Sequence, residues 1–133
     1  MSKTGKKVLI VDDMPTILDE AKKAIGDRYD CVVAGSGTEA IEIAKNEKPD
    51  IALIDMHMPD MNGISCMQAI HRVAELVNMP ILITMNDVSV ITKARAFDHG
   101  AIDFLQKPFI SENMYRKIDM HLKLAEVGYK YEA

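Results

Sequence analysis

Residues 51–63 read IALIDMHMPDMNG, and this stretch decides how the rest of the chain is interpreted. Its first four residues are apolar without polar alternation, which favours a strand buried on both faces of a parallel sheet. Asp55 follows directly, and a turn-rich loop with Pro59 and Gly63 comes next. Ligands of open α/β sheets bind beyond the carboxyl ends of the strands, so Asp55 stands where chemistry is expected. A lone Asp at this position more often ends or caps a strand. Whether Asp55 has a functional role therefore depends on the residues at the ends of the other strands.

Length and composition indicate one globular domain. The chain has 133 residues, 48% of them hydrophobic and 27% charged, which is ordinary for a domain with a proper core. We expect a single domain over residues 1–133 with its core at about 7–127. The net charge of −4 argues against direct nucleic-acid binding. Without a membrane-length apolar run or a signal peptide, a cytoplasmic protein that does not bind membranes is expected. Cys31 and Cys66 lack metal-like spacing and are expected to be buried thiols.

Strand and helix patterns alternate along the whole chain. Apolar runs predict strands at 7–11, 31–34, 51–54, 80–85 and 101–106. Helical spacing and caps predict helices at 15–25, from a capping box of Ser36 and Glu39 onward, at 64–77, at 88–99, and from a Ser111 cap to about 127. Alternation through short loops implies a parallel sheet with right-handed crossovers. We therefore predict an α/β fold with a doubly wound five-stranded parallel sheet, flavodoxin-like, (βα)5, in strand order 2-1-3-4-5.

Polar residues follow the predicted strands at their carboxyl ends. Asp12 and Asp13 end the first strand, Asp55 ends the third, Thr84 lies near the end of the fourth, and Lys107 follows the fifth. Strands one and three are neighbours in this order, so the three carboxylates would share one cleft and repel each other. A hard divalent cation such as Mg²⁺ would relieve that repulsion. Lys107 would add a fixed positive charge and Thr84 a hydroxyl donor.

This arrangement fits phosphoryl transfer, in which catalysis is mostly positioning and charge stabilisation. A carboxylate can act as the nucleophile and form an aspartyl-phosphate. Asp55 is the best candidate because it lies central to the sheet, between the acid pair and the strands of Thr84 and Lys107. Taken alone, the pair Asp12 and Asp13 could be ordinary charge at a helix N-terminus. The prediction of a phosphoryl-transfer site rests on finding Asp12, Asp13, Asp55, Thr84 and Lys107 together at the ends of the predicted strands.

Taken in order along the chain, these residues resemble the receiver domain of two-component response regulators. The resemblance rests on Val11-Asp12-Asp13, residues 54–63, Thr84 and Lys107-Pro108-Phe109. It covers roughly residues 7–127. It implies that Asp55 accepts a phosphoryl group from a phosphohistidine on a sensor histidine kinase or a phosphotransfer protein.

The resemblance also implies a ligand set for the metal and the phosphoryl group. Mg²⁺ would be held directly by Asp13, Asp55 and the backbone carbonyl of His57, and through water by Asp12. Thr84 and Lys107 would contact the phosphoryl oxygens.

The resemblance also implies a conformational switch and two residues that tune the lifetime of the phosphoryl group. Thr84 and Phe104 would move together toward the phosphorylated site. The fourth helix, fifth strand and fifth helix form the family's usual output face, where a homodimer or a fused effector domain would be engaged. His57 and Asn86 stand at positions that tune phosphoryl lifetime, and Met85 replaces the small residue that often follows Thr84, which could narrow access to the acceptor.

Three other functions were weighed on the same residues. A phosphohydrolase of the haloacid-dehalogenase type also uses an Asp nucleophile, but it needs a second acid where His57 stands and usually a cap domain. A flavodoxin-like mononucleotide binder would need a Ser/Thr/Gly-rich loop after the first strand, where Asp12 and Asp13 oppose a phosphate without a metal. A receiver-fold interaction module that is never phosphorylated is disfavoured by the intact set that includes Thr84 and Lys107.

The remaining ionisable residues are expected to be ordinary surface groups. The histidines show no mutual ligand spacing and are expected to be solvated or capping, not metal ligands: His57, His71, His99 and His121. The charged residues of the last helix are expected to form a solvated face: Arg116, Lys117, Asp119, Lys123 and Glu126.

Overall fold

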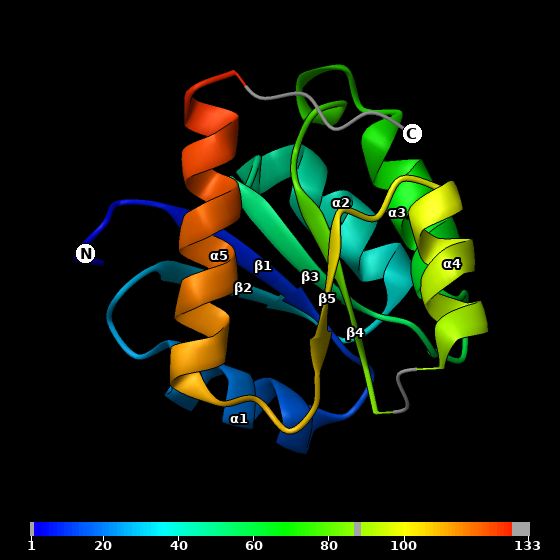
Figure 1. The fold of residues 1–133 in the computed structure, drawn as a ribbon, viewed down its shortest axis with the longest axis horizontal. Coiled ribbons are helices and arrows are strands. Elements are labelled where there is room, and N and C mark those ends of the chain that lie inside the picture. The colour runs from blue at the N-terminus through cyan, green and yellow to red at the C-terminus, as the bar shows by residue number, and fades with distance from the viewer. Residues whose placement is uncertain (1, 87–88, 129–133) are drawn as a thin grey trace.

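The computed structural model describes residues 2–86 and 89–128. Its strands are β1 (Lys7–Val11), β2 (Asp30–Ala34), β3 (Ile51–Asp55), β4 (Ile81–Met85) and β5 (Asp103–Gln106). They form one sheet in the order β2-β1-β3-β4-β5, with every pairing parallel (Figure 1). The predicted α/β class, parallel five-stranded sheet and strand order are confirmed.

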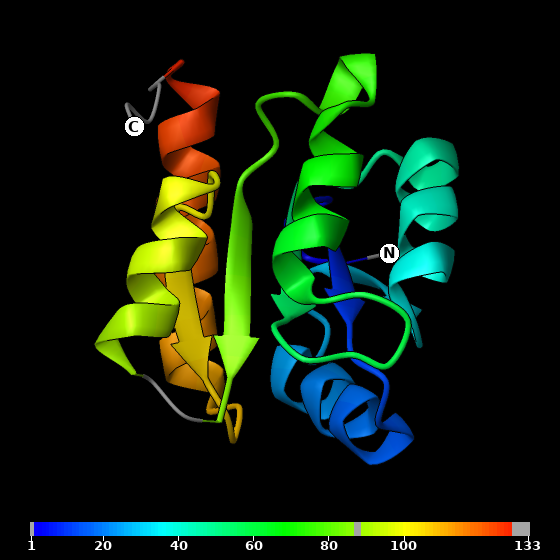
Figure 2. The same ribbon diagram turned by 90° about the vertical axis from the view of Figure 1, so that its right-hand side faces the viewer.

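Helices cover both faces of the sheet (Figures 1 and 2). They are α1 (Pro15–Ile25), α2 (Gly37–Glu47), α3 (Gly63–His71), α4 (Val90–Asp98) and α5 (Ser111–Glu126), with a short 3-10 helix η1 (Ala74–Leu76). The apolar sides of α1 and α5 pack with one face of the strands, and those of α2, α3 and α4 pack with the other. The result is the three-layer arrangement that a doubly wound sheet requires.

The central strand β3 is buried along its whole length, because it lies between β1 and β4 and is covered from both sides. Residues 51–54 have no exposed surface, which explains why their sequence is apolar without alternation. Asp55 closes this strand and is still only 6% exposed. The fold therefore carries one acid directly at the end of its most buried strand.

Local signals at the helix ends are only partly confirmed. Ser36 caps α2, and its side chain accepts the N–H of Glu39 at 3.1 Å, as predicted. The predicted Ser111 cap is wrong, since Ile110 holds the N-cap position and Ser111 is the first residue of α5. The Ser111 hydroxyl instead donates to the carbonyl oxygen of Ala24 at 2.8 Å. The Ser111 hydroxyl is therefore bonded to the end of α1 and does not cap α5.

The predicted helix at 64–77 is two elements. α3 ends at His71, and η1 follows at 74–76. Val73 between them has extended backbone angles, and the His71 ring bonds to the carbonyl oxygen of Met79 at 2.9 Å. The apolar periodicity continues because Leu76 is buried, so periodicity alone could not detect this break.

Two further boundaries differ by a few residues. The described part of α4 begins at Val90, after a Ser89 cap that accepts the N–H of Thr92, and the predicted start at residue 88 lies outside the described residues. β5 begins at Asp103 and not at 101, because the N–H of Ala101 still bonds to α4, at the Ala96 carbonyl.

Within residues 2–86 and 89–128, no helix has the length and apolar character needed to cross a membrane. Cys66 is fully buried, and burial raises the pKa of its thiol to about 12. Cys31 is only half-buried on the edge strand β2. The prediction of buried thiols is therefore correct for Cys66 and only partly correct for Cys31.

Candidate functional site

The carboxyl ends of β1 and β3 bring three acids into one cluster. Asp12, Asp13 and Asp55 each offer an oxygen, and these oxygens all lie within 4.8 Å of one another. The register explains the meeting, because Val11 pairs with Ile54 and the acids follow at the same edge of the sheet. Asp12 and Asp55 are buried, while Asp13 is more exposed.

Lys107 supplies a buried positive charge to this cluster. Its Nζ lies 2.8 Å from Asp55 Oδ1 and 2.6 Å from Asp12 Oδ2. The chain after β5 is held in place by a hydrogen bond from the Lys107 N–H to the Met85 carbonyl at 2.9 Å. With all groups ionised, three carboxylates and one ammonium leave two negative charges uncompensated (3 − 1 = 2).

Burial and the contact between Asp55 and Lys107 act in opposite directions on the pKa values of these two residues. Burial raises the pKa of Asp55, and the charges of Asp12 and Asp13 act in the same direction, while the hydrogen bond from Lys107 opposes them. Burial alone would lower the pKa of Lys107, but its contacts with Asp12 and Asp55 outweigh burial and raise it. Lys107 therefore stays protonated at neutral pH, and the charged form of Asp55 is disfavoured by burial and by the neighbouring carboxylates.

One oxygen of the cluster fits a metal ligand. Asp12 Oδ1 accepts the N–H of Met14 at 3.0 Å. Asp12 Oδ2 is buried, and Lys107 Nζ lies 2.6 Å from it. A buried carboxylate that shares its ammonium partner with Asp55, beside unbalanced negative charge, matches what a hard cation such as Mg²⁺ prefers.

Thr84 lies beside Asp55 on the neighbouring strand. The two residues are register partners in the β3–β4 ladder, and the Thr84 carbonyl accepts the N–H of Met56 at 3.0 Å. Thr84 is 1% exposed. A hydroxyl therefore stands at the same buried edge as the acids, as the strand pattern predicts.

The loop after Asp55 is closed tightly at its base. The Gly63 N–H donates to the Met56 carbonyl at 2.8 Å. A Cβ at position 63 would lie 2.5 Å from the Asp55 carbonyl oxygen, so only glycine fits there. Asn62 caps α3 by accepting the N–H of Ser65 at 2.8 Å.

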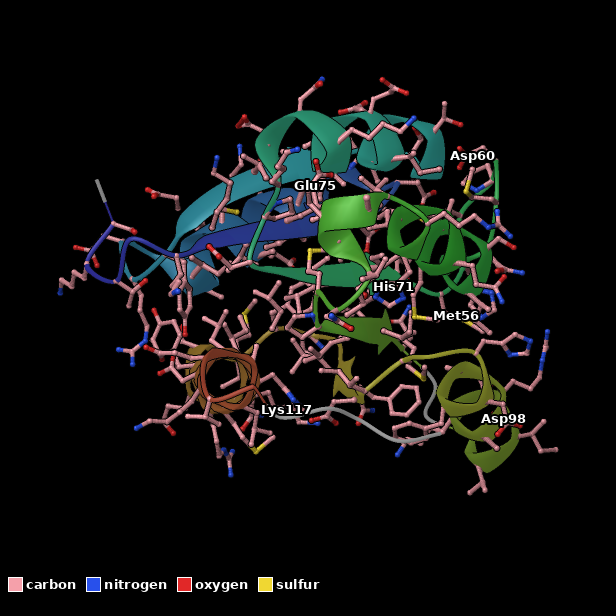
Figure 3. All side chains as sticks on the ribbon, turned by 90° about the horizontal axis from the view of Figure 1, so that it is seen from above. Met56, Asp60, His71, Glu75, Asp98 and Lys117 are labelled. Carbon is pink, nitrogen blue, oxygen red and sulfur yellow. The ribbon has the colours of Figure 1, made fainter. Side chains whose placement is uncertain are left out.

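The tip of the same loop is tied to α2. Asp60 accepts the backbone N–H groups of Gly37 at 3.1 Å and Thr38 at 2.9 Å, and the Thr38 hydroxyl at 2.9 Å. These bonds lower the pKa of Asp60. In Figure 3, Asp60 lies where the loop passes the end of α2. Residues 56–62 are therefore held at both ends, and His57 is exposed between them.

The other predicted residues lie around this centre. Asn86 is exposed just after β4, and its carbonyl accepts the Gln106 side chain at 3.4 Å. Phe104 is 6% exposed, and its ring packs edge-on against Phe97 of α4 with centroids 4.7 Å apart. Met85 is 2% exposed and lies in the same apolar cluster as Phe104.

A second charged cluster involves residues that the sequence pattern assigns to the solvated surface. His121, expected to be solvated or capping, is 3% exposed, and its Nε2 lies 2.9 Å from Asp103 Oδ2. Lys117, expected on a solvated face, places Nζ 2.9 Å from Asp103 Oδ1. Asp119, from the same predicted face, binds Arg28 and the hydroxyl of Tyr29.

Lys117 and His121 reach Asp103 because α5 packs over β5. Burial acts to raise the pKa of Asp103, but hydrogen bonds from His121 and Lys117 lower it to about 2. The available signal was the spacing of Lys117 and His121, which stand four residues apart and so share one side of a helix.

A model of the response regulator receiver domain family matches residues 8–119. This chain belongs to that family. The receiver domain is 28% identical over 124 residues to a probable C4-dicarboxylate response regulator of Bacillus subtilis, a match that covers 91% of this chain and 54% of the relative. The chain thus spans about half the length of that relative.

Solved receiver structures share the whole fold. A receiver domain protein from Methanospirillum hungatei superposes with a TM-score of 0.84 at 27% identity, covering 92% of this chain and 98% of that one. The chemotaxis protein CheY4 of Vibrio cholerae gives 0.83 at 28% identity, covering 87% and 98%. Phosphorylation signalling in two-component systems is the role of this family, so the receiver domain is a signalling module and not a conventional enzyme.

Proposed function

We propose that Asp55 is the phosphoryl acceptor of this receiver domain. The observation that carries the proposal is its placement: a buried carboxylate at the end of the central strand, 2.8 Å from Lys107 Nζ and within 4.8 Å of the Asp12 and Asp13 oxygens. Among the described residues, Asp12, Asp13 and Asp55 form the one such cluster of acids, and Asp55 is the member that closes the central strand.

The donor in this proposal is a phosphohistidine on a sensor histidine kinase or a phosphotransfer protein. The P–N bond to the imidazole breaks, a P–O bond to an Asp55 oxygen forms, and the imidazole keeps the electron pair of the broken bond. Lys107, already beside Asp55, offsets the charge on the phosphoryl oxygens, and Thr84 offers its hydroxyl to one of them. The transfer then needs positioning and charge balance and no further proton acceptor.

The proposed cofactor is Mg²⁺. Asp13, Asp55 and the His57 backbone carbonyl would hold it directly and Asp12 through water. When bound, the ion would neutralise acidic charge and help orient the phosphoryl oxygens. The single ammonium that Asp12 and Asp55 share and the charge imbalance of the three clustered acids support this ligand set.

The proposed readout is a coupled movement of Thr84 and Phe104 that changes the surface of α4, β5 and α5. A homodimer or a fused effector domain would bind that surface, and the greater length of the relatives is consistent with a fused partner. His57 and Asn86, both exposed beside the acceptor, would set how fast water removes the phosphoryl group. We place this single receiver domain, with its core at about 7–127, in the cytoplasm with its phosphodonor.

The test is labelling with acetyl phosphate in Mg²⁺, followed by intact and peptide mass spectrometry. The unchanged chain should gain one phosphoryl group on the peptide that contains Asp55, and Asp55→Asn should gain none. EDTA should prevent labelling of the unchanged chain. Asp98→Asn is the matched control, because that acid is exposed on α4. Equal labelling of Asp55→Asn, or labelling that survives EDTA, would contradict the acceptor or the metal assignment respectively.

A further inference from the structure

The outer side of β5 is occupied by charged side chains. β5 is an edge strand that pairs with β4 only. The Lys107 N–H bonds to Met85 of β4, so by alternation Leu105 turns its backbone groups toward β4 and Phe104 turns its groups to the open edge. Edge groups of this kind are usually left to water or to another chain.

Both outward backbone groups of Phe104 have a partner within the domain. Its N–H donates to Asp103 Oδ1 at 2.7 Å, and its carbonyl accepts Lys117 Nζ. Lys117 also lies 2.9 Å from Asp103 Oδ1, and His121 lies 2.9 Å from Asp103 Oδ2. In Figure 3, where α5 is seen end-on, Lys117 lies on the side of the helix toward β5. We call Asp103, Lys117 and His121 the Phe104 clamp.

The side chain of Phe104 points the other way. Its ring packs on Phe97 of α4, and Lys93 Nζ lies 5.8 Å from the ring centroid. Figure 1 shows β5 between α5 and α4. The same residue thus touches α4 through its ring and α5 through its backbone.

We infer that Lys117, anchored by Asp103, is a positioning residue that couples the Phe104 backbone to α5 and carries the state of the acceptor site to that helix. The inference deepens the proposed function and rests on it. Lys107, three residues beyond Phe104, contacts Asp55, so a rearrangement at the acceptor acts directly on the end of β5. The Phe104 N–H is bonded to Asp103, and Lys117 of α5 is bonded to both Asp103 and the Phe104 carbonyl. These charge-assisted bonds hold β5 firmly against α5.

The Lys117–Asp103 pair is partly exposed, with the Lys117 side chain 35% and the Asp103 side chain 22% exposed. Solvent screens a pair of this kind, so Lys117 is expected to contribute only modestly to folding. Loss of Lys117 should therefore change the coupling of β5 to α5 more than it changes the folded state.

The first measurement uses the unphosphorylated chain and backbone amide hydrogen exchange by NMR. Lys117→Met keeps the aliphatic stem and removes the charge, and we expect Phe104 amide exchange to accelerate by about fivefold. Arg116→Met is the matched control, because that exposed neighbour bonds to Asn113 on its own helix at 2.7 Å. Asp103→Asn should act like Lys117→Met. Exchange at Phe104 that stays within about twofold of the unchanged chain in both clamp variants would overturn the inference.

The second measurement follows amide chemical shifts when acetyl phosphate and Mg²⁺ are added. In Lys117→Met, labelling of Asp55 and the shift changes of Phe97 on α4 should persist, while those of Met120 on α5 should fall to less than about half. Full α5 changes in the variant would overturn the relay. An unchanged chain that takes no phosphoryl group would instead overturn the proposed function, and with it the relay, while the exchange measurement still decides whether the clamp exists.

Discussion

Lys107 sets the charge balance of the cluster formed by Asp12, Asp13 and Asp55. It touches two buried carboxylates, and a third acid lies close by. Breaking a buried ion pair on one side leaves uncompensated charge, which costs far more than losing an exposed pair. The stability of the metal-free domain should therefore depend on this single side chain.

Lys107→Met should lower the free energy of unfolding by about 3–5 kcal/mol in EDTA at pH 7. The penalty should shrink as pH falls, because burial raises the pKa of Asp55 and protonation then discharges this carboxylate in the variant. Urea denaturation at pH 7 and pH 5 measures both effects. Lys45→Met is the control, since Lys45 forms an exposed pair with Glu42 at 3.5 Å and should cost less than about 1 kcal/mol. Equal losses for the two variants would show that the Lys107 contacts do not balance buried charge.

At the scale of elements, two glycines differ in what surrounds them. Gly63, at the start of α3, faces the Asp55 backbone, and Gly37, at the start of α2, faces the Met61 side chain. A side chain can move aside, whereas the backbone of a buried strand cannot do so without disturbing its ladder. The same added methyl group should have unequal effects.

Gly63→Ala should destabilise the domain by about 2–3 kcal/mol and reduce phosphorylation, because the new Cβ would lie 2.5 Å from the Asp55 carbonyl oxygen. Gly37→Ala should stay within about 1 kcal/mol, since Met61 can adopt another rotamer. Urea denaturation and acetyl phosphate labelling of both variants provide the comparison. A Gly37→Ala variant that is the less stable of the two would show that the loop tip matters more than its base.

At the scale of the whole molecule, the sequence was sufficient to predict the architecture and the cluster of three acids. Strands such as 51–54 are apolar because both faces are covered, so their pattern reports the sheet directly. Residues that follow strands in register, such as Asp55 and Thr84, must then meet at one edge. Side chains that reach across elements could not be predicted in this way. Ser111 and Lys117 find partners on α1 and β5 whose distance depends on how the helices pack.

Metal binding should be visible in the stability of the whole domain. Mg²⁺ at about 100-fold above its Kd should add about 2.7 kcal/mol to the free energy of unfolding, because only the folded chain assembles the acid cluster. Asp13→Asn should remove most of this gain at little cost in EDTA, because Asp13 is the most exposed of the three acids. Thermal melts with Mg²⁺ or EDTA measure it, with Asp19→Asn on α1 as the exposed control. A gain that survives in Asp13→Asn would place the ion elsewhere.

The Asp60 bonds have one more consequence, for selectivity among anions. The first turn of a helix attracts free phosphate through its unpaired N–H groups. In α2 two of these groups already hold a carboxylate of the same chain. The Asp60 carboxylate therefore occupies the helix end that inorganic phosphate would otherwise bind, so free phosphate should not displace the loop that borders Asp55.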